Sequence, residues 1–385
     1  MAARSGWKRA APPASVPAPV SACVAGPMTR DGGADAALSI GGVDITPGFR
    51  GAVDVPVAPM YTHDNLSIAV QLVRGRRPGP VLFVSAAVHG DEINGVEIIR
   101  RLLRHPTLGR LRGTLVAAPI VNVYGFLAHS RYLPDGRDLN RSFPGSPKGS
   151  LAGRVAHTFV REIVSKCTHG IDLHTGARHR SNFPQIRADL DQPEALAMTE
   201  AFGVPLAIDA KIRDGSLREC AGDLGIPVIL YEAGEALRFD EMYIRAGVRG
   251  VINVMRSLGM LPRSRGRAPA PPLVVSDQTT WVRAPESGVL RCFAALGDKV
   301  DRGQVIAMVA DPLGEAETPL QSPVNGVVIG RSNLPLMYEG DAIFHIAQYG
   351  RRVRTVERQV EQFTEAHQSG DDPSLAPDDG ELPIA

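Results

Sequence analysis

Three side chains of this sequence combine metal-binding chemistry with positions that could bring them to one metal ion. His89 and Glu92 stand three residues apart in a polar turn after the apolar run 81–88, and His174 ends the short apolar segment 170–174. Imidazole nitrogens and carboxylate oxygens are zinc ligands, and three protein ligands leave a position open for water, as in catalytic zinc sites. We therefore predict one Zn²⁺ per chain, held by His89, Glu92 and His174. The structural alternatives are a turn histidine, a glutamate at a helix start and a hydrogen-bonded core histidine.

Two further carboxylates can support this chemistry. Asp172 lies two residues before His174, on the same face of the predicted strand, and can accept the second ring N–H of that histidine. Glu232 directly follows the apolar segment 228–231 and can act as a general base. Zinc lowers the pKa of a bound water to about 7 and polarises a carbonyl, so a base beside it completes a hydrolytic site. A surface or helix-capping role is the alternative for Glu232.

The polar segment 122–149 supplies positive charge. Arg131 and Arg141 carry planar guanidinium groups suited to an oxyanion and a substrate carboxylate, and Asn140 can hydrogen-bond an amide. Asp138 is expected to position an arginine. Connections of this length inside a compact domain are usually functional, although a solvated charged loop is the alternative.

The elements that must position these residues alternate along the chain. Apolar runs predict strands, and apolar side chains spaced three and four residues apart predict helices. The predicted strands cover residues 66–73, 81–88, 113–121, 170–174 and 228–231, and the predicted helices cover 96–103, 151–166, 192–202 and 239–258. Strands that alternate with helices indicate an α/β fold with a mostly parallel sheet. Residues that follow the strands of such a sheet meet at its carboxyl edge, where ligands bind.

Composition places limits on function. The chain has 385 residues, 44% hydrophobic and 22% charged, so it can bury a sizeable core and form two domains. A net charge of +1 gives no reason to expect a nucleic-acid or membrane-surface partner. The four cysteines lack CxxC spacing, which is typical of free thiols in a reducing compartment, so we expect a cytoplasmic protein. No apolar stretch reaches the length of a membrane span.

Shifts in composition predict the domain boundaries. Residues 1–38 are rich in Ala and Pro and predict a disordered leader, and residues 39–261 form the predicted zinc hydrolase domain. Pro and Arg mark a linker at 262–275. Short apolar runs between Gly and Asp turns predict a small all-β domain at 276–348. Residues 349–385 are expected to be a mostly disordered tail that begins with a short helix.

Four segments, in this order, resemble the motifs of one known family. HGDE at 89–92, NVYGFLAHSRYLPDGRDLNRSFPG at 122–145, IDLHTG at 171–176 and YEAGE at 231–235 are similar to motifs of the succinylglutamate desuccinylase/aspartoacylase family of zinc carboxypeptidase-like hydrolases. The resemblance covers roughly residues 50–260. It implies a mixed, mostly parallel central sheet with helices on both faces.

The resemblance also implies roles for particular side chains. The matching residues of the family bind zinc (His89, Glu92, His174), act as base (Glu232), stabilise the tetrahedral intermediate (Arg131) and bind the substrate carboxylate (Asn140, Arg141). Arg218 is a looser match to a further substrate-binding arginine. The implied activity is that of a zinc-dependent hydrolase of linear amide bonds.

The all-β domain resembles a different fold. Residues 285–288 and 323–326 are two similar P-x-x-G units, as in the two halves of a biotinyl/lipoyl-like barrel-sandwich domain. Carrier domains of that kind present a modified lysine at a hairpin tip, whereas the matching turn at 310–314 contains no lysine. We therefore expect a rim or lid beside the active site and not a swinging arm.

These inferences lead to one expected function and two alternatives. We expect a deacylase that removes an acyl group from an N-acyl amino acid or a related small amide, using zinc-activated water and Glu232 as the base. One alternative is a zinc carboxypeptidase that acts on a peptide tail, and the other is a non-catalytic metal-binding or interaction module. The expected partner is a small-molecule substrate. We expect neither a nucleic-acid nor a membrane partner, and the sequence is compatible with a homo-oligomer. The acyl group and the amino acid are not specified by the sequence.

Overall fold

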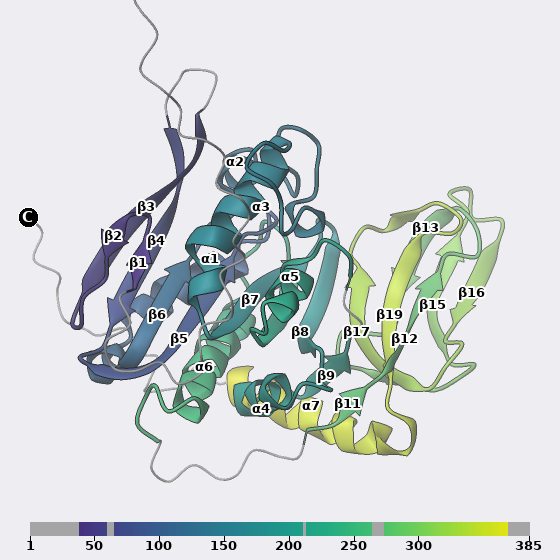
Figure 1. Ribbon diagram of the computed structural model, residues 1–385. Helices are drawn as coiled ribbons and strands as arrows, with labels where there is room; N and C mark the ends of the chain where they lie inside the picture. The colour runs from purple at the N-terminus through teal and green to yellow at the C-terminus, as the bar shows by residue number, and fades with distance from the viewer. Residues whose placement is uncertain (1–37, 60–64, 211–212, 264–272, 369–385) are drawn as a thin grey trace, which may run out of the picture.

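One large mixed sheet organises the molecule. The computed structural model describes residues 38–59, 65–210, 213–263 and 273–368 (Figure 1). The four strands at the centre of the sheet run parallel to one another, in the order β6 (Arg112–Ala118), β5 (Arg77–Ala86), β7 (His169–Gly176) and β10 (Val228–Glu235). The predicted α/β fold is confirmed, and its parallel pairs lie where the site residues were expected.

Antiparallel strands extend this centre on both sides. At one edge, β4 (Asn65–Arg74) pairs with β6 and β3 (Arg50–Pro59) pairs with β4. On the other side, β8 (Arg180–Ala188) runs antiparallel to β10. The remaining short strands are β9 (Leu206–Asp209), parallel to β8, β11 (Val275–Ser276), parallel to β9, and the hairpin of β1 (Ser39–Ile40) and β2 (Val43–Asp44).

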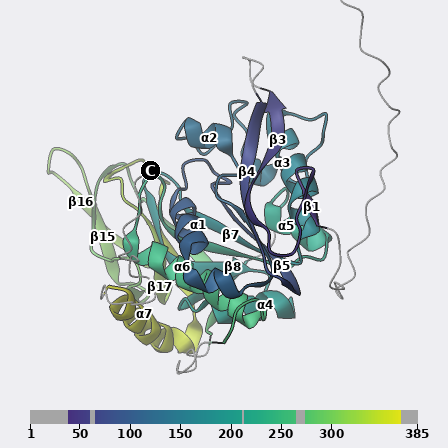
Figure 2. The same ribbon diagram turned by 90° about the vertical axis from the view of Figure 1, so that its left-hand side faces the viewer.

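Helices cover both faces of the sheet (Figure 2). One face packs against α1 (Asn94–Arg104), α4 (Pro193–Phe202) and α6 (Glu241–Ser257), and the other packs against α3 (Leu151–Glu162) and α5 (Leu217–Asp223). Successive residues of β5 explain this arrangement, because Leu82 and Val84 belong to the first core and Phe83 to the second. A strand buried on both faces is apolar throughout, which is why the run 81–88 could be recognised.

Short helices lie in the connections. The segment 122–149 contains α2 (Val123–Leu127) and the 3-10 helix η2 (Leu139–Arg141). The other 3-10 turns are η1 (Pro106–Arg110), η3 (Val164–Lys166) and η4 (Gly350–Arg352). Strand β5 begins at Arg77, earlier than the predicted start at residue 81.

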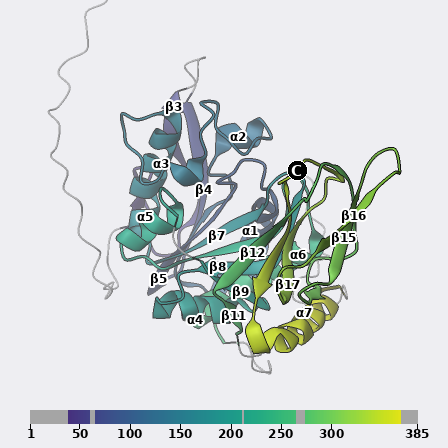
Figure 3. The same cartoon turned by 90° about the vertical axis from the view of Figure 1, so that its right-hand side faces the viewer.

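The C-terminal β domain continues the large sheet (Figure 3). Strand β17 (Gly326–Ser332) pairs antiparallel with β8 and with β19 (Ala342–Gln348), which pairs with β12 (Gln278–Arg283). A second sheet contains β16 (Glu317–Gln321), β15 (Val305–Ala310), β13 (Gly288–Cys292) and β18 (Leu336–Met337), and β14 (Lys299–Val300) pairs with β17. Residues such as Ile306, Val328 and Phe344 form a separate apolar core in this domain.

The last described element is α7 (Val353–Gln368), which is longer than the short helix expected there. Its Val356, Val360 and Phe363 enter the same core as α6. The predicted leader up to residue 37, linker residues 264–272 and the end of the tail from residue 369 lie outside the described residues. No helix in the part of the chain that the structure describes combines the length and apolarity needed to cross a membrane. Cys167, Cys220 and Cys292 carry free thiols, and the cytoplasmic location stays a prediction.

Candidate metal centre and catalytic pocket

The turn between β5 and α1 presents His89 and Glu92. It packs tightly on α2, because a Cβ atom on Gly90 would lie 2.0 Å from the carbonyl carbon of Gly125. Only glycine permits this approach of two backbones. The backbone N–H of Glu92 donates to the carbonyl of His89 at 3.1 Å, which closes the turn and directs both side chains to the same place.

Strands β7 and β10 bring two more residues to the same edge. Ala86 at the end of β5 is level with Leu173, so His174 lies beside the turn. Glu232 is paired with His174 in the β10–β7 register and therefore occupies the same level of the sheet. Four residues from three segments that are far apart in the sequence thus meet at the carboxyl ends of three neighbouring strands.

His89, Glu92 and His174 form a compact, buried group. One potential ligand atom from each residue lies within 4.8 Å of the others. The two oxygens of Glu92 separate the histidines: Oε1 lies 2.8 Å from Nδ1 of His89, and Oε2 lies 2.8 Å from Nδ1 of His174. The three residues are 4%, 1% and 5% exposed, respectively. Two imidazoles and one carboxylate at this spacing fit the ligand set of a catalytic zinc ion.

Two aspartates contact the other ring nitrogens of the histidines. Asp172 Oδ2 lies 2.7 Å from Nε2 of His174, and Asp138 Oδ1 lies 3.1 Å from Nε2 of His89. Asp172 also accepts a hydrogen bond from Ser85 at 2.7 Å. Carboxylates in these positions orient a ligating imidazole and increase its basicity. The sequence suggested this contact for Asp172 but not for Asp138.

The charges in this group are strongly coupled. Burial lowers the pKa of His174, but the carboxylates of Asp172 and Glu92 outweigh burial and raise it well above its ordinary value. Burial similarly opposes the shift of Glu92, whose pKa is nevertheless lowered by the two histidines. The carboxylate is therefore ionised at neutral pH and can serve as a ligand.

The arginine-rich segment lies against this group. Arg131 donates to Glu92 Oε1 at 3.1 Å and to Asp138 Oδ2 at 3.0 Å, so Asp138 holds an arginine as expected. Asn140 is buried, and its Oδ1 accepts the backbone N–H of Leu217 at 2.9 Å. Arg141 is exposed and donates to the carbonyl oxygen of Asn140.

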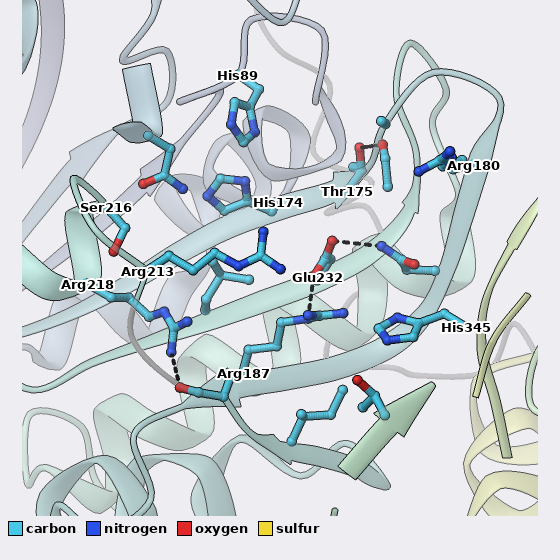
Figure 4. A pocket seen from close by; sticks show the side chains of 18 of the residues that line it. His89, His174, Thr175, Arg180, Arg187, Arg213, Ser216, Arg218, Glu232 and His345 are labelled. Carbon is cyan, nitrogen blue, oxygen red and sulfur yellow. Dashed lines mark hydrogen bonds and ion pairs between the residues drawn. The ribbon is translucent and has the colours of Figure 1, made fainter. Parts of the chain in front are cut away.

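All of the predicted site residues line one cavity of about 1010 Å³. Figure 4 labels His89, His174, Arg218 and Glu232 among them. Its charged lining contains seven arginines and five carboxylates. These are Arg131, Arg141, Arg180, Arg187, Arg213, Arg218 and Arg331, with Glu92, Asp172, Asp209, Glu232 and Asp277. Burial and the nearby Arg187 lower the pKa of Arg218, whose Nη1 also donates to Ala210 at 3.4 Å. Arg187, Arg213 and Arg218 lie near one another on the side of the cavity away from His89 (Figure 4), and we call these three residues the arginine wall.

Sequence reasoning missed several residues of the cavity lining. Asn182 and Arg187 on β8 contact the two oxygens of Glu232, at 2.7 and 2.6 Å. Arg213 points toward the centre of the cavity (Figure 4). The polar composition of β8 and its internal proline gave no strand signal, so a search for site residues on strands could not find the first two.

The C-terminal β domain forms another part of the cavity lining, through β12 and β19. The rings of Trp281 and His345 stack with centroids 4.2 Å apart and planes at 5°, and the guanidinium of Arg180 lies 5.5 Å from the indole centroid. Burial and the nearby Arg187 and Arg213 lower the pKa of His345 to about 3. This histidine is therefore uncharged at neutral pH.

Comparison with known proteins gives consistent results. The family model for the succinylglutamate desuccinylase/aspartoacylase catalytic domain matches residues 78–258. The N-alpha-acetyl-L-2,4-diaminobutyric acid deacetylase of Halomonas elongata is 30% identical over 301 residues, which cover 73% of this chain and 85% of that protein.

Two solved structures share the fold. The product-bound ectoine utilization protein EutE (DoeB) from Ruegeria pomeroyi has a TM-score of 0.69 and 23% identity, over 78% of this chain and 94% of that chain. The succinylglutamate desuccinylase/aspartoacylase from Rhodobacter sphaeroides has a TM-score of 0.69 and 24% identity, over 78% of this chain and 96% of that chain. The similarity extends beyond the residues matched by the family model.

Proposed function

The chain belongs to the succinylglutamate desuccinylase/aspartoacylase family, and we propose that it is a zinc-dependent deacylase that hydrolyses the amide bond of a small N-acyl amino acid. One observation carries the proposal: the group of His89, Glu92 and His174 shares a single cavity with the carboxylate of Glu232. Hydrolysis of an unactivated amide needs both a group that polarises the carbonyl and a base for water.

The residues of the cavity have complementary roles in this reaction. His89, Glu92 and His174 would hold the zinc ion, which would polarise the carbonyl and lower the pKa of water. Glu232 accepts a proton from the attacking water as the oxygen bonds to the carbonyl carbon. When the carbon–nitrogen bond breaks, Glu232 passes this proton to the amine nitrogen, and the products are a carboxylic acid and a free amine. Arg131 stabilises the negative charge on the carbonyl oxygen.

The charge of the cavity favours an anionic substrate. Arg141 and Asn140 are suited to bind the carboxylate of the amino acid, and Arg218 lies on the same lining. Arg131 pairs with Glu92 and Arg187 pairs with Glu232, so five arginines of the lining remain beside three carboxylates, Asp172, Asp209 and Asp277. We propose that an acidic N-acyl amino acid is preferred over one with a side-chain ammonium, such as the compound named for the Halomonas elongata relative.

A substrate panel tests the proposal. Zinc-loaded protein is incubated with N-acetyl and N-succinyl amino acids of acidic, neutral and basic side chains and with short peptides, and release of free amine is measured. We expect release from the acidic N-acyl amino acids and none from chelated protein. Glu232→Gln should keep its zinc and lose about 10²–10⁴-fold in kcat. Cleavage of the peptides alone would support a carboxypeptidase, and zinc binding without any hydrolysis would support a binding module.

A further inference from the structure

Strand β8 contacts the carboxylate of Glu232 at both oxygen atoms. Asn182 Nδ2 donates to Oε1 at 2.7 Å, and Arg187 Nε forms an ion pair with Oε2 at 2.6 Å (Figure 4). We infer that Asn182 is a positioning residue that aims Glu232, and that the C-terminal β domain contributes to catalysis by holding Asn182 in place. This inference rests on the proposed role of Glu232 as the base.

A β-bulge brings Asn182 to the face of the sheet that carries Glu232. In the β10–β8 pair, Glu232 is opposite Gln185 but Gly234 is opposite Asn182, so β8 has one extra residue in this stretch. In a regular ladder, Phe183 would be opposite Gly234, and Asn182 would point to the other face. The bulge therefore places a carboxamide beside the base. Bulges are frequent next to active sites, where they re-aim side chains.

The residues inside the bulge fit this interpretation. Phe183 turns into the apolar core, where its ring centroid lies 6.0 Å from that of Phe363 on α7. Pro184 follows it and has no amide hydrogen, so its position between the two registers of β8 and β10 removes no ladder hydrogen bond. The sequence of β8 is thus adapted to the irregular pairing.

Strand β17 of the C-terminal domain holds Asn182 from the other edge of β8. Gly330 is opposite Asn182, and a Cβ atom on Gly330 would lie 2.6 Å from Asn182 Oδ1. The carboxamide therefore occupies space that any other residue at position 330 would fill. Asn182 is buried at 7% exposure, so the displaced group would have to move relative to Glu232.

Asn333 joins the same domain to both strands. Its Nδ2 donates to Ser181 Oγ at 2.6 Å and to Glu235 Oε2 at 2.9 Å. Ser181 precedes Asn182 on β8, and Glu235 lies three residues after Glu232 on β10. The C-terminal domain consequently fixes the two strands that carry the base and its positioning residue.

The function of a general base is sensitive to such placement. A displacement of about 1 Å in a catalytic group can cost on the order of 100-fold in rate. Asn182 donates one hydrogen bond to a carboxylate and forms part of the cavity lining beside it. Its loss should therefore affect turnover more than substrate binding.

Replacement of Asn182 in the full-length, zinc-loaded protein tests the inference directly. Asn182→Ala should lower kcat by about 10–100-fold, with little change in KM or zinc content. Asn182→Asp keeps the size of the side chain, which protects the fold, but places a second carboxylate beside Glu232 and should also lower kcat. Full kcat in the folded Asn182→Asp variant would overturn the inference.

A double-mutant cycle separates positioning from general damage to the structure. If Asn182 acts only through Glu232, Asn182→Ala should have no further effect on the residual rate of Glu232→Gln. If it lowers that residual rate by the same factor as in the wild type, its role is structural and the inference fails. An active Glu232→Gln enzyme would instead refute the proposed function itself.

A pair of glycine substitutions tests the contribution of the C-terminal domain. Gly330→Ala should lower kcat, as Asn182→Ala does, because the added methyl group collides with the carboxamide of Asn182. Gly288→Ala on β13 is the matched control, since its Cβ would lie 2.4 Å from the carbonyl oxygen of Ala310, within the same domain but away from β8. It should lower the melting temperature without changing kcat of the folded enzyme. Equal kcat in both variants would contradict the inference.

Discussion

The metal-binding group and the base are assembled in different ways. His89 and Glu92 come from one short turn, and His174 reaches them from the neighbouring strand β7. Glu232 depends instead on β8, on a bulge in that strand and on β17 of the C-terminal domain. A structural change far from the cavity should therefore displace Glu232 more easily than it displaces the metal ligands.

The largest expected effect comes from removing a ligand. His174→Ala should abolish metal binding at stoichiometric zinc and reduce deacylation to background, because two ligands alone hold zinc weakly. Zinc content by elemental analysis and amine release are the two measurements. Glu232→Gln is the matched comparison, since it should lose activity and keep zinc. Full zinc content in the His174→Ala variant would show that the ligand set is wrong.

The difference between the two regions also decided what could be predicted from the sequence. Residues 81–88 before His89 are apolar except for Ser85, and the turn after them is polar, so both could be recognised locally. His174 and Glu232 lie near the ends of apolar strands and could be found in the same way. Parallel pairing of these strands then required their ends to meet.

Strand β8 could not be predicted by the same reasoning. Its sequence RSNFPQIRA contains a proline and does not alternate regularly, because the bulge at residues 183–184 shifts the pattern by one. Its pairing with β17 involves residues that are distant in the sequence. Asn182 and Arg187 therefore became recognisable only in the three-dimensional structure.

A smaller effect is expected where Asp172 contacts His174. Asp172→Asn should weaken zinc affinity by about 10–100-fold, because the amide no longer favours the imidazole in its ligating form. Competition with a chelator measures this change. Asp209→Asn is the control, since Asp209 lines the same cavity but accepts the backbone N–H of Leu190 at 3.2 Å. Equal zinc affinity in both variants would mean that the contact of Asp172 with His174 does not support the metal.

The arginine wall should affect selectivity and leave zinc binding unchanged. Arg213→Gln should lower kcat/KM for an acidic N-acyl amino acid by about fivefold, because an exposed ion pair contributes at most about 1 kcal/mol. The kcat/KM for the matching substrate, in which an amide replaces the side-chain carboxylate, should change little. Arg178→Gln is the control, because Arg178 is outside the cavity lining and donates to His129 at 2.9 Å. Equal losses for the acid and the amide would exclude charge recognition by Arg213.

The smallest effect concerns α1, the helix that follows the metal-binding turn. Glu97 accepts hydrogen bonds from Arg100 at 2.6 Å and Arg101 at 2.7 Å, and Arg101 also pairs with Glu241 of α6 at 2.7 Å. The hydrogen bond from Arg100 is the main cause that lowers the pKa of Glu97 to about 2. Because the pKa is lower in the folded state, this contribution to stability is present above the ordinary glutamate pKa and is lost as the pH falls toward 2.

Glu97→Gln should therefore lower the melting temperature at pH 7 by about 1–4 °C, with zinc affinity unchanged. The difference from wild type should shrink as the pH falls from about 5 toward 2, because the unfolded wild-type chain takes up a proton at Glu97 at a higher pH than the folded state does. Thermal unfolding with a chelator at every pH keeps metal loss out of the comparison, and Glu361→Gln on α7, an exposed position, is the control. A difference in melting temperature that stays constant with pH would show that the charge of Glu97 does not stabilise α1. The metal-binding turn before this helix would then depend on packing alone.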